Sequence, residues 1–411
     1  MGRFVLYAKL AWRNLFRNKR RTIIAGTAIG IGLASLIFVD GVMLGMEKNM
    51  TASATSSFLG EAQIHAAGYR DARESALVIH NLNSVLTTLE HSDIVDRSTV
   101  RVFSLATISS PGNIAAVSLV GIEPSTEQYL SQIDDAMIEG AYFEGDDRHD
   151  LTIGSRLAEI LEVVIGDRVV VTVAQSDGGD LSQEMFRVSG IYHFNANDMD
   201  RAMAFVRISS AQKMLAIGSD VHEIALTFVD RNLAQNDSLP FWEELSRYNN
   251  EAVSWQILLP QIQAALELVG FTMLLVGLIL FGVVSLGIVN TLFMSMYERM
   301  FEFGVLRAVG TPPFAMAQQI MLEAASLAVV SVVIGSLIGW GVTYYALVTG
   351  IDYRGIEYSG ITIRTLLYPV LELRQFVFYP LVTGFLTVVV GLYPAVYAAR
   401  LSPAKAMRRS M

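Results

Sequence analysis

Four apolar stretches, each long enough to cross a bilayer as a helix, are placed unevenly along this chain. One lies near the start, at residues 22–45, and three lie in the last third, at 266–294, 320–348 and 376–399. A hydrocarbon core of about 30 Å requires about 20 apolar residues in a helix. The pattern therefore predicts an integral membrane protein with four transmembrane helices and a large domain, residues 46–265, inserted between the first helix and the second.

The inserted region alternates between strand-like and helix-like patterns. Its Gly- and Asp-rich middle, at about 126–219, predicts a β-rich lobe with several turns. We therefore expect an α+β base, formed by both ends of the region at about 46–125 and 220–262, that carries this lobe. The strand-like runs are 61–65, 99–108, 114–122 and 221–229, and the helix-like runs are 75–89, 155–161, 210–217 and 239–248.

The charged residues predict the orientation in the membrane. The net charge is −9, but segments 1–21 and 400–411 contain basic and no acidic residues, whereas 46–265 contains 14 basic and 31 acidic residues, a net charge of −17. Short basic flanks stay in the cytoplasm. We therefore expect both termini and the loop 295–319 to be cytoplasmic, and the large domain and the loop 349–375 to be periplasmic, in a bacterial inner membrane. The acidic domain does not favour a nucleic-acid partner.

The N-terminal part of the chain has two open features. Residues 1–21 predict a cytoplasmic amphipathic helix, with Val5, Ala8 and Trp12 on one face, and a plain basic flank is the alternative. The first apolar stretch could be a signal peptide. Its apolar run of about 23 residues is longer than the 7–15 residues of a signal sequence, so we expect it to stay as a transmembrane helix.

The motifs of common enzymes are missing from the sequence. There is no cysteine, no G-x-x-x-x-G-K-[ST] phosphate loop and no G-x-S-x-G elbow, and the six histidines have no metal-binding spacing. We therefore expect that the chain is not an enzyme by itself, and that it binds no metal or cofactor of its own.

The loop between the second and third apolar stretches carries the most informative sequence. Residues 297–310 predict a short amphipathic helix that a glycine and two prolines end. Phe303 and Leu306 are expected on one side of this helix. Glu298, Glu302 and Arg307 are expected on another. A rigid helix with charges and aromatics at the inner face of a membrane suits docking into a groove of a partner protein. An ordinary loop in the lipid headgroups is the alternative.

The same loop carries a resemblance to a known family. Residues 302–311 read E-F-G-V-L-R-A-V-G-T, which is similar to the E-I-G-x-L-R-A-x-G loop of FtsX-type permeases. The opening at 11–22 and the close at 398–407 also resemble that family. The chain thus resembles the MacB and LolC/LolE class of ABC transporters, the type VII or mechanotransmission class, over essentially its whole length. In the large domain the resemblance lies in residues 60–69, 121–124 and 153–158.

The resemblance implies a permease subunit that works as a homo- or heterodimer above two LolD-like ATPase subunits, which bind ATP and magnesium. The base and the lobe would correspond to the Porter and Sabre subdomains of the family. The loop would be the coupling helix, through which ATP-driven movement of the first two transmembrane helices reaches the periplasmic domain. Because no ATPase precedes the first apolar stretch, the layout resembles LolC and LolE more than MacB. The expected coupling residues are Tyr297, Glu298, Arg299, Phe301, Glu302, Phe303, Gly304, Leu306, Arg307 and Gly310.

Polar residues within the apolar stretches are candidates for function or for packing. Asp40 lies near the outer end of the first stretch, where it can also be hydrated, and Asn290 and Glu323 lie near the inner ends of the second and third. Such groups face protein or water rather than lipid. For Asn290 and Glu323 we expect packing between helices, or contact with the coupling loop, rather than substrate binding.

Two further sets of residues predict contacts of the first apolar stretch. Met43 and Met46, with Asp40 and opposite Phe271, would line a lateral opening toward the outer leaflet, where acyl chains enter in lipoprotein-releasing relatives. Glycines four residues apart predict close packing against another helix. These glycine pairs are Gly26 with Gly30, Gly41 with Gly45, and Gly335 with Gly339.

Three functions remain open at this stage. The first is extraction of a lipidated substrate, such as a lipoprotein, from the outer leaflet and its delivery to a periplasmic carrier. The second is MacB-like efflux of drugs or peptides with an adaptor protein. The third is FtsX-like regulation of a cell-wall hydrolase. The sequence does not identify the substrate, the carrier or the partner permease.

Overall fold

The chain folds into two compact units. The helical unit comprises residues 1–49, 265–356 and 363–411, and the sheet unit comprises 50–264 and 357–362. The amphipathic helix expected within 1–21 and the tail after residue 400 lie largely outside the described residues. The structure, a computed structural model, describes residues 9, 11–13, 19–145, 147–176, 178–194, 197–352, 357–358, 361–362 and 366–400.

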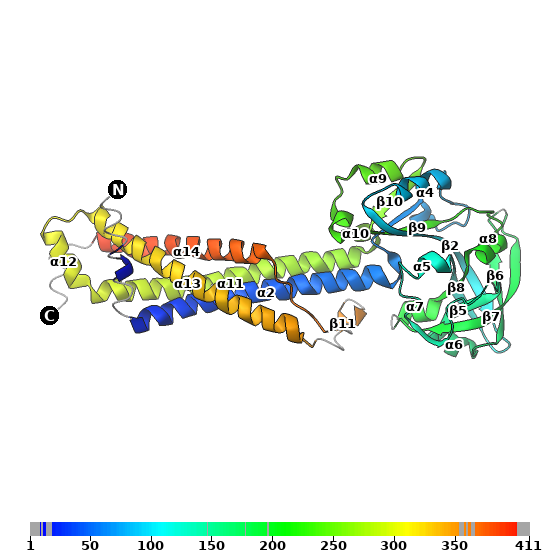
Figure 1. Ribbon diagram of the computed structural model, residues 1–411, viewed down its shortest axis with the longest axis horizontal. Coiled ribbons are helices and arrows are strands. Elements are labelled where there is room, and N and C mark those ends of the chain that lie inside the picture. The colour runs from blue at the N-terminus through cyan, green and yellow to red at the C-terminus, as the bar shows by residue number, and fades with distance from the viewer. Residues whose placement is uncertain are drawn as a thin grey trace. The chain divides into compact units, whose positions relative to one another are not determined.

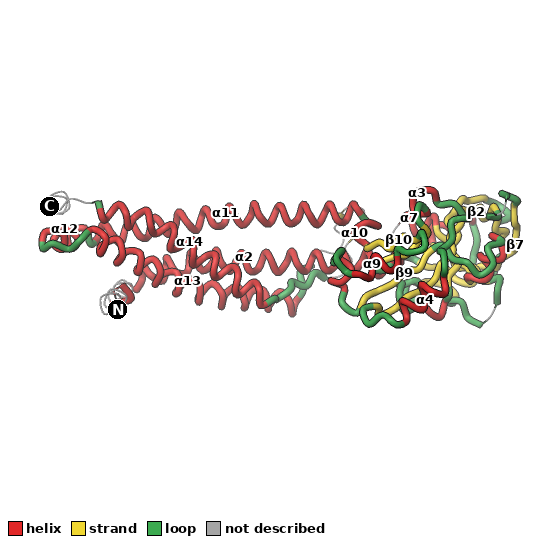
Figure 2. Tube along the Cα trace, turned by 90° about the horizontal axis from the view of Figure 1, so that it is seen from above, coloured by secondary structure: helices red, strands yellow, loops and turns green. Residues whose placement is uncertain are grey.

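Long apolar helices make up the helical unit. In the described part of the chain, four helices are long and apolar enough to cross a membrane. They run lengthwise beside one another, and a short helix, α12, lies at one end of the group (Figure 1). The tube in Figure 2 shows the same arrangement from a second side. The helices are α2 (Lys19–Ala54), α11 (Pro260–Glu298), α12 (Met300–Ala308), α13 (Pro313–Thr349) and α14 (Leu373–Ala399).

Helices α2 and α13 pack closely because both present glycine at their contact. A Cβ atom added at Gly335 would lie 2.7 Å from the backbone oxygen of Gly30, and one added at Gly339 would lie 3.2 Å from the Cα atom of Ala34. Gly26 faces Val330 at 3.5 Å in the same way. Gly30 of the first pair and Gly335 of the third thus meet, and Gly26 and Gly339 face other residues of the opposite helix, which confirms the close helix packing predicted for these pairs.

The pair Gly41 and Gly45 makes a contact that the spacing did not predict, beside the predicted approach of another helix at Gly41. A Cβ atom at Gly41 would lie 2.9 Å from the backbone oxygen of Val370, and the backbone of Tyr368 approaches Gly45 as closely. The N–H of Val370 donates to the backbone oxygen of Gly41 at 2.8 Å. Gly41 therefore admits both this extended segment and the Thr343 side chain of α13, which lies 3.1 Å from the added Cβ atom, whereas Gly45 admits the extended segment. Sequence spacing alone could not separate these two partners.

The sheet unit is built on one sheet of ten strands. Its order is β10-β1-β9-β2-β3-β8-β5-β7-β4, and β6 pairs with both β2 and β7. The strands are β1 (Ala62–Ala66), β2 (Val95–Ser109), β3 (Ile114–Ile122), β4 (Met137–Gly140), β5 (Asp150–Gly154), β6 (Arg168–Ala174), β7 (Leu181–Tyr192), β8 (Met203–Arg207), β9 (Glu223–Phe228) and β10 (Asn250–Ser254), with β11 (Glu357–Tyr358) and β12 (Ile361–Thr362) forming a separate pair.

Six of these strands close into a barrel. The pairing runs β2-β3-β8-β5-β7-β6 and returns to β2, so every strand in this ring has two neighbours. Closure removes the free edges of the ring and leaves one side of each strand for a core. Strand β2 is long enough to take part in both the barrel and the rest of the sheet. Residues 95–101 pair with β9, and residues 101–109 pair with β3.

Short helices connect the strands. Segment 75–89 was predicted to be one helix, but α4 begins only at Leu82. The preceding residues bond to other elements instead: Ile79 N–H donates to the Val221 oxygen, and His80 and Asn250 exchange two hydrogen bonds. The helices are η1 (Thr55–Leu59), α3 (Tyr69–Ala72), α4 (Leu82–Glu90), α5 (Pro124–Glu127), α6 (Ser155–Leu161), α7 (Asn197–Ala202), α8 (Ile208–Leu215), η2 (Arg231–Gln235), α9 (Pro240–Leu245) and α10 (Trp255–Leu258).

The two ends of the inserted region meet in the sheet. Strand β1, which follows α2 and η1, lies between β9 and β10, and β10 leads through α10 into α11. The barrel also uses β3 and half of β2, both of which precede residue 126. The division into a base and an inserted lobe at residues 125 and 220 therefore stays a prediction, because a single sheet continues through both.

Candidate coupling site

Helix α12 is a separate short helix with defined ends. Arg299, at φ −108° and ψ 14°, interrupts the helical path after α11. At the other end Thr311 N–H donates to the Leu306 oxygen at 2.9 Å and Gly310 N–H to the Arg307 oxygen at 3.1 Å, with Gly310 at φ +99°. These two bonds form a Schellman motif, in which the residue at positive φ favours glycine. Pro313 then starts α13 at a position that needs no N–H donor.

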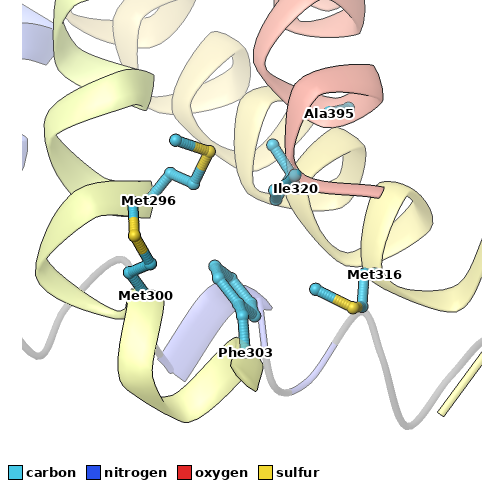
Figure 3. Packing of buried hydrophobic residues seen from close by; sticks show 7 residues of the cluster. Met296, Met300, Phe303, Met316, Ile320 and Ala395 are labelled. Atoms are coloured by element: carbon cyan, nitrogen blue, oxygen red, sulfur yellow. The ribbon is translucent and has the colours of Figure 1, made fainter. Parts of the chain in front are cut away.

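The side of α12 that carries Met300 and Phe303 packs into a methionine-rich core. Phe303 is 1% exposed and lies among side chains from α11, α13 and α14 (Figure 3). Gly304, next to it, is also buried. Burial of a phenylalanine of this kind stabilises a packed contact by about 2–3 kcal/mol. The core consists of Met296, Met300, Phe303, Met316, Ile320, Ala395 and Ala398.

A buried cation joins α12 to α13. Arg299 Nε donates to Glu302 Oε2 at 3.0 Å, and Arg299 Nη1 donates to Glu323 Oε1 at 2.5 Å. The guanidinium also lies 5.2 Å from the ring centroid of Phe303. The Arg299 and Glu323 side chains are only 15% and 8% exposed. Glu323 thus contacts the coupling loop, one of the two roles expected for it, and Arg299 holds the short helix in place.

The outer side of α12 is apolar and exposed. Phe301 is 52% exposed, Val305 40% and Val309 82%, and Phe314 at the start of α13 is 78% exposed. Leu306 was expected to lie beside Phe303, but it is also exposed. The buried residues of α12 are Met300, Phe303 and Gly304, and Leu306 lies on another side of the helix. The sequence prediction missed Val305, Val309 and Phe314. Val305 and Val309 follow Phe301 at intervals of four residues, a spacing that indicates one face, whereas Phe314 belongs to the next helix.

The other predicted coupling residues have different surroundings. Tyr297 is 45% exposed and its ring stacks on Phe293, with 6.1 Å between centroids. Glu298 is exposed at the end of α11. Arg307 is half-buried and donates to the Thr311 oxygen at 3.4 Å, so it supports the turn that ends α12.

A groove runs along the N-terminal half of α2 and the C-terminal half of α11. Its volume is about 1060 Å³, and Asn290 of α11 lines it together with Lys19 and Arg20 of α2. Small side chains such as Ala28 and Gly287 give the groove its depth. Asn290 therefore faces this groove rather than a tightly packed contact.

Asp40 is held by α14. Its carboxylate accepts from Tyr379 Oη at 2.6 Å and from Gln375 Nε2 at 3.0 Å. This contact gives Asp40 a packing role between two apolar helices. Met43 and Met46 are half-buried and Phe271 is 58% exposed, so the lateral opening assigned to them stays a prediction.

One cluster in the sheet unit superficially resembles a hydrolase triad. Ser155 Oγ lies 2.9 Å from His193 Nδ1, and Asp200 Oδ2 lies 2.9 Å from the same nitrogen. A histidine base needs one ring nitrogen toward the nucleophile and the other toward the carboxylate. This arrangement therefore does not activate Ser155 as a nucleophile.

Comparison with known proteins finds relatives that align with almost the whole chain. The lipoprotein-releasing system transmembrane protein LolC of Neisseria meningitidis serogroup B is 23% identical over 426 residues, covering 98% of this chain and 99% of that protein. LolE of Haemophilus influenzae is 20% identical over 417 residues, covering 97% and 98%. The periplasmic region of MacB from Actinobacillus actinomycetemcomitans is 14% identical with a TM-score of 0.35, covering 52% of this chain and 95% of that structure.

Two family models match separate parts of the chain. The FtsX-like permease C-terminal family matches residues 274–403, which include α12 and the Arg299 contacts. The MacB-like periplasmic core domain family matches residues 22–236, more than half of the chain. The chain therefore belongs to the FtsX-type permeases of ABC transporters that carry a MacB-like periplasmic core domain.

Proposed function

We propose that this permease uses ATP hydrolysis by a separate ATPase to extract lipidated substrate, in particular lipoprotein, from the outer leaflet of the inner membrane. The substrate would then pass to a periplasmic carrier. Relatives named for lipoprotein release align with nearly the whole chain, which supports this substrate class over drugs or peptides.

The observation that carries the proposal is the construction of α12. The helix is pinned by Arg299, packed through Phe303 and ended by a rigid turn, yet its outer side presents Phe301, Val305 and Val309 to solvent. A rigid helix with an exposed apolar face is a docking element for a groove in a partner. As a permease of this class, the chain works with an ATPase partner in the inner membrane.

The proposed mechanism is mechanical. Four membrane-spanning helices, with both termini and α12 in the cytoplasm, would place α12 against an ATPase that binds ATP and magnesium. Closure of the ATPase would push α12, and the contact between Arg299 and Glu323 would pass the push to α13. A second permease copy or paralogue would complete the assembly, and the periplasmic domains would hand on the acyl chains.

Copurification tests the docking assignment. Val305→Asp places a charge on the outer side of α12 and should reduce the amount of copurified ATPase roughly tenfold, because loss of one central contact costs about 1–2 kcal/mol. Val164→Asp is the matched control, since Val164 is an exposed valine of the sheet unit at 63% exposure. Full ATPase recovery with Val305→Asp would contradict docking through this face.

Depletion of the chain in its own bacterium tests the substrate. We expect lipoproteins of the outer membrane to accumulate in the inner membrane, which fractionation and immunoblotting measure. Correctly placed lipoproteins would contradict the proposal. Cross-linking to a periplasmic adaptor would then favour MacB-like efflux, and cross-linking to a cell-wall hydrolase would favour FtsX-like regulation.

A further inference from the structure

A fully buried arginine lies at the centre of the sheet unit. Arg101 of β2 is 0% exposed and makes two hydrogen bonds to Glu127, at 2.9 and 2.6 Å, and one to Glu223, at 2.8 Å. Removing a guanidinium from water costs several kcal/mol unless carboxylates surround it. Here two buried carboxylates, from α5 and β9, supply that compensation.

The same guanidinium stacks on the end of the first long helix. The Arg101 Cζ atom lies 3.8 Å from the ring centroid of Phe58. Phe58 belongs to η1, a single π-helical turn that continues α2 into the sheet unit. The ring also meets Phe205 of the barrel strand β8 edge-on, with 5.5 Å between centroids. Phe58 thus touches two strands of the barrel, β2 and β8, although it belongs to neither.

The segment that follows α2 and the segment that leads into α11 bond to each other near this stack. Gly60 N–H donates to the Thr55 oxygen at 2.8 Å and closes the π-turn. The next residue, Glu61, accepts from Trp255 N–H at 3.0 Å through its backbone oxygen. Trp255 starts α10, which leads into α11. The chain therefore leaves α2 and returns toward α11 at neighbouring residues of one sheet.

We propose that Arg101 is a positioning residue for transport: it clamps Phe58, and thereby the end of α2, to the sheet, so that movement of α2 is transmitted to the barrel. The inference rests on the proposed function, because it names the residues through which the movement required for transport would pass from α2 to the barrel. Phe58, Arg101, Glu127 and Glu223 form this joint. A π-turn is a frequent site of functional adjustment in a helix.

The chemistry of the joint requires arginine and an aromatic ring. A planar guanidinium can bind one carboxylate with two parallel bonds and still present its face to a ring. Lysine carries the same charge but has neither the fork nor the flat face. Leucine in place of Phe58 would keep an apolar side chain in the core and lose the stacked cation.

The absence of cysteine in the natural chain makes a labelling experiment direct. Spin labels at Lys48→Cys on α2 and Ile114→Cys on β3 report on movement between the helix and the barrel. A second pair, Ile114→Cys with Leu181→Cys, reports on the barrel fold. Both pairs are measured by electron–electron double resonance in the full complex with its ATPase, in nanodiscs, with and without ATP and vanadate.

We expect ATP to shift the first distance distribution in the otherwise wild-type chain. Arg101→Lys and Phe58→Leu should lose this shift while the distribution of the barrel pair stays unchanged. Phe143→Leu is the matched control, because it removes a ring from the same buried cluster that packs on Tyr142 and Arg207 and not on Phe58 or Arg101, and it should keep the shift.

Each other outcome contradicts a defined statement. A wild-type shift in both Arg101→Lys and Phe58→Leu would overturn the joint and leave the transport mechanism standing. An equal loss in Phe143→Leu would mean that general loosening of the core is responsible, which also overturns the joint. No ATP-dependent shift in the wild-type chain would overturn the transport mechanism itself, and the joint with it.

Discussion

Glu223 and His65 are buried neighbours whose pKa values move in opposite directions. Burial raises the pKa of Glu223 to about 7, against the attraction of Arg101, and a second carboxylate, Glu127, adds to the rise. Burial lowers the pKa of His65 to about 4. One guanidinium cannot neutralise two carboxylates, so the cluster as a whole disfavours ionised Glu223.

The raised pKa of Glu223 predicts a pH dependence of stability. The folded domain binds the Glu223 proton more tightly than the unfolded chain, whose pKa is near 4.5. This stabilisation is fully present below pH 4.5 and is lost as the pH rises through about 7. Glu223→Gln should therefore gain stability relative to wild type between pH 4.5 and 8, by on the order of 2 kcal/mol.

Thermal unfolding of the full chain in detergent, followed by tryptophan fluorescence from pH 4.5 to 8, measures this gain. His65 contributes with the opposite sign, because stability is lost as it gains a proton below its ordinary value of 6.5. The difference between variant and wild type removes that contribution. Glu243→Gln, at an exposed position on α9, is the control. Parallel pH curves for wild type and Glu223→Gln would contradict the assignment.

A second prediction about single residues concerns Arg299 and the contact that it makes between α12 and α13. Arg299→Met removes the cation between Glu302 and Glu323 and should destabilise the contact of α12 with α13 by about 2–4 kcal/mol. The double variant Arg299→Met with Glu323→Met should recover part of this loss, because it no longer buries the Glu323 charge. Hydrogen exchange of the amides of residues 300–308 measures the effect.

The control for this prediction is Arg20→Met, which makes the same substitution at an exposed arginine of α2. It should leave exchange in α12 unchanged. Equal protection of α12 in wild type and Arg299→Met would show that the ion pair does not hold the helix.

At the scale of elements, the packing of α2 on α13 depends on glycine. Gly335→Leu would place a side chain where the backbone of Gly30 already lies, with 2.7 Å from the added Cβ atom to the Gly30 oxygen. We expect a loss of about 1–3 kcal/mol from this overpacking. Gly341→Leu on the same helix is the control, since nothing lies within 4 Å of a Cβ atom there.

The yield of detergent-solubilised chain and its thermal midpoint measure this difference. Gly335→Leu should lower both, and Gly341→Leu should leave both near the wild-type values. Similar losses in the two variants would assign the effect to leucine in an apolar helix and not to the contact with α2.

Periodicity predicted many elements and few of their partners. The strand-like run at 114–122 matches β3, and the helix-like run at 155–161 matches α6, because each shows its own period along the chain. Arg101 gave no comparable signal, since Glu127 and Glu223 lie 26 and 122 residues away in sequence. The closed barrel was missed for the same reason: β6 pairs with β2 across about 60 residues, and no local pattern encodes that pairing.

The candidate site shows the same limit. The break at Gly310 and the prolines could be predicted, because turn chemistry is local. Spacing groups Phe301, Val305 and Val309 on one face, but it could not predict that this face is the exposed one, because a short helix with apolar residues on several sides can bury any of them. Packing against Met316 and Ala395, from two other helices, decides that Phe303 is buried and Leu306 exposed.

At the scale of the whole molecule, charge and hydrophobicity together predict the orientation in the membrane. The sheet unit belongs to the region of net charge −17, and the segments before α2 and after α14 contain basic residues without acidic ones. Positive flanks resist transfer across the inner membrane. The exposed apolar face of α12 can meet an ATPase only if that face lies in the cytoplasm.

Cysteine labelling in cells tests this orientation. Leu306→Cys on α12 should react with a membrane-impermeant maleimide only after the inner membrane is opened. Val164→Cys in the sheet unit should react in spheroplasts whose inner membrane is intact. Both side chains are exposed, at 40% and 63%, so a difference between them reports the side of the membrane and not burial. Labelling of Leu306→Cys in intact spheroplasts would place α12 in the periplasm, where no ATP-driven partner could push it.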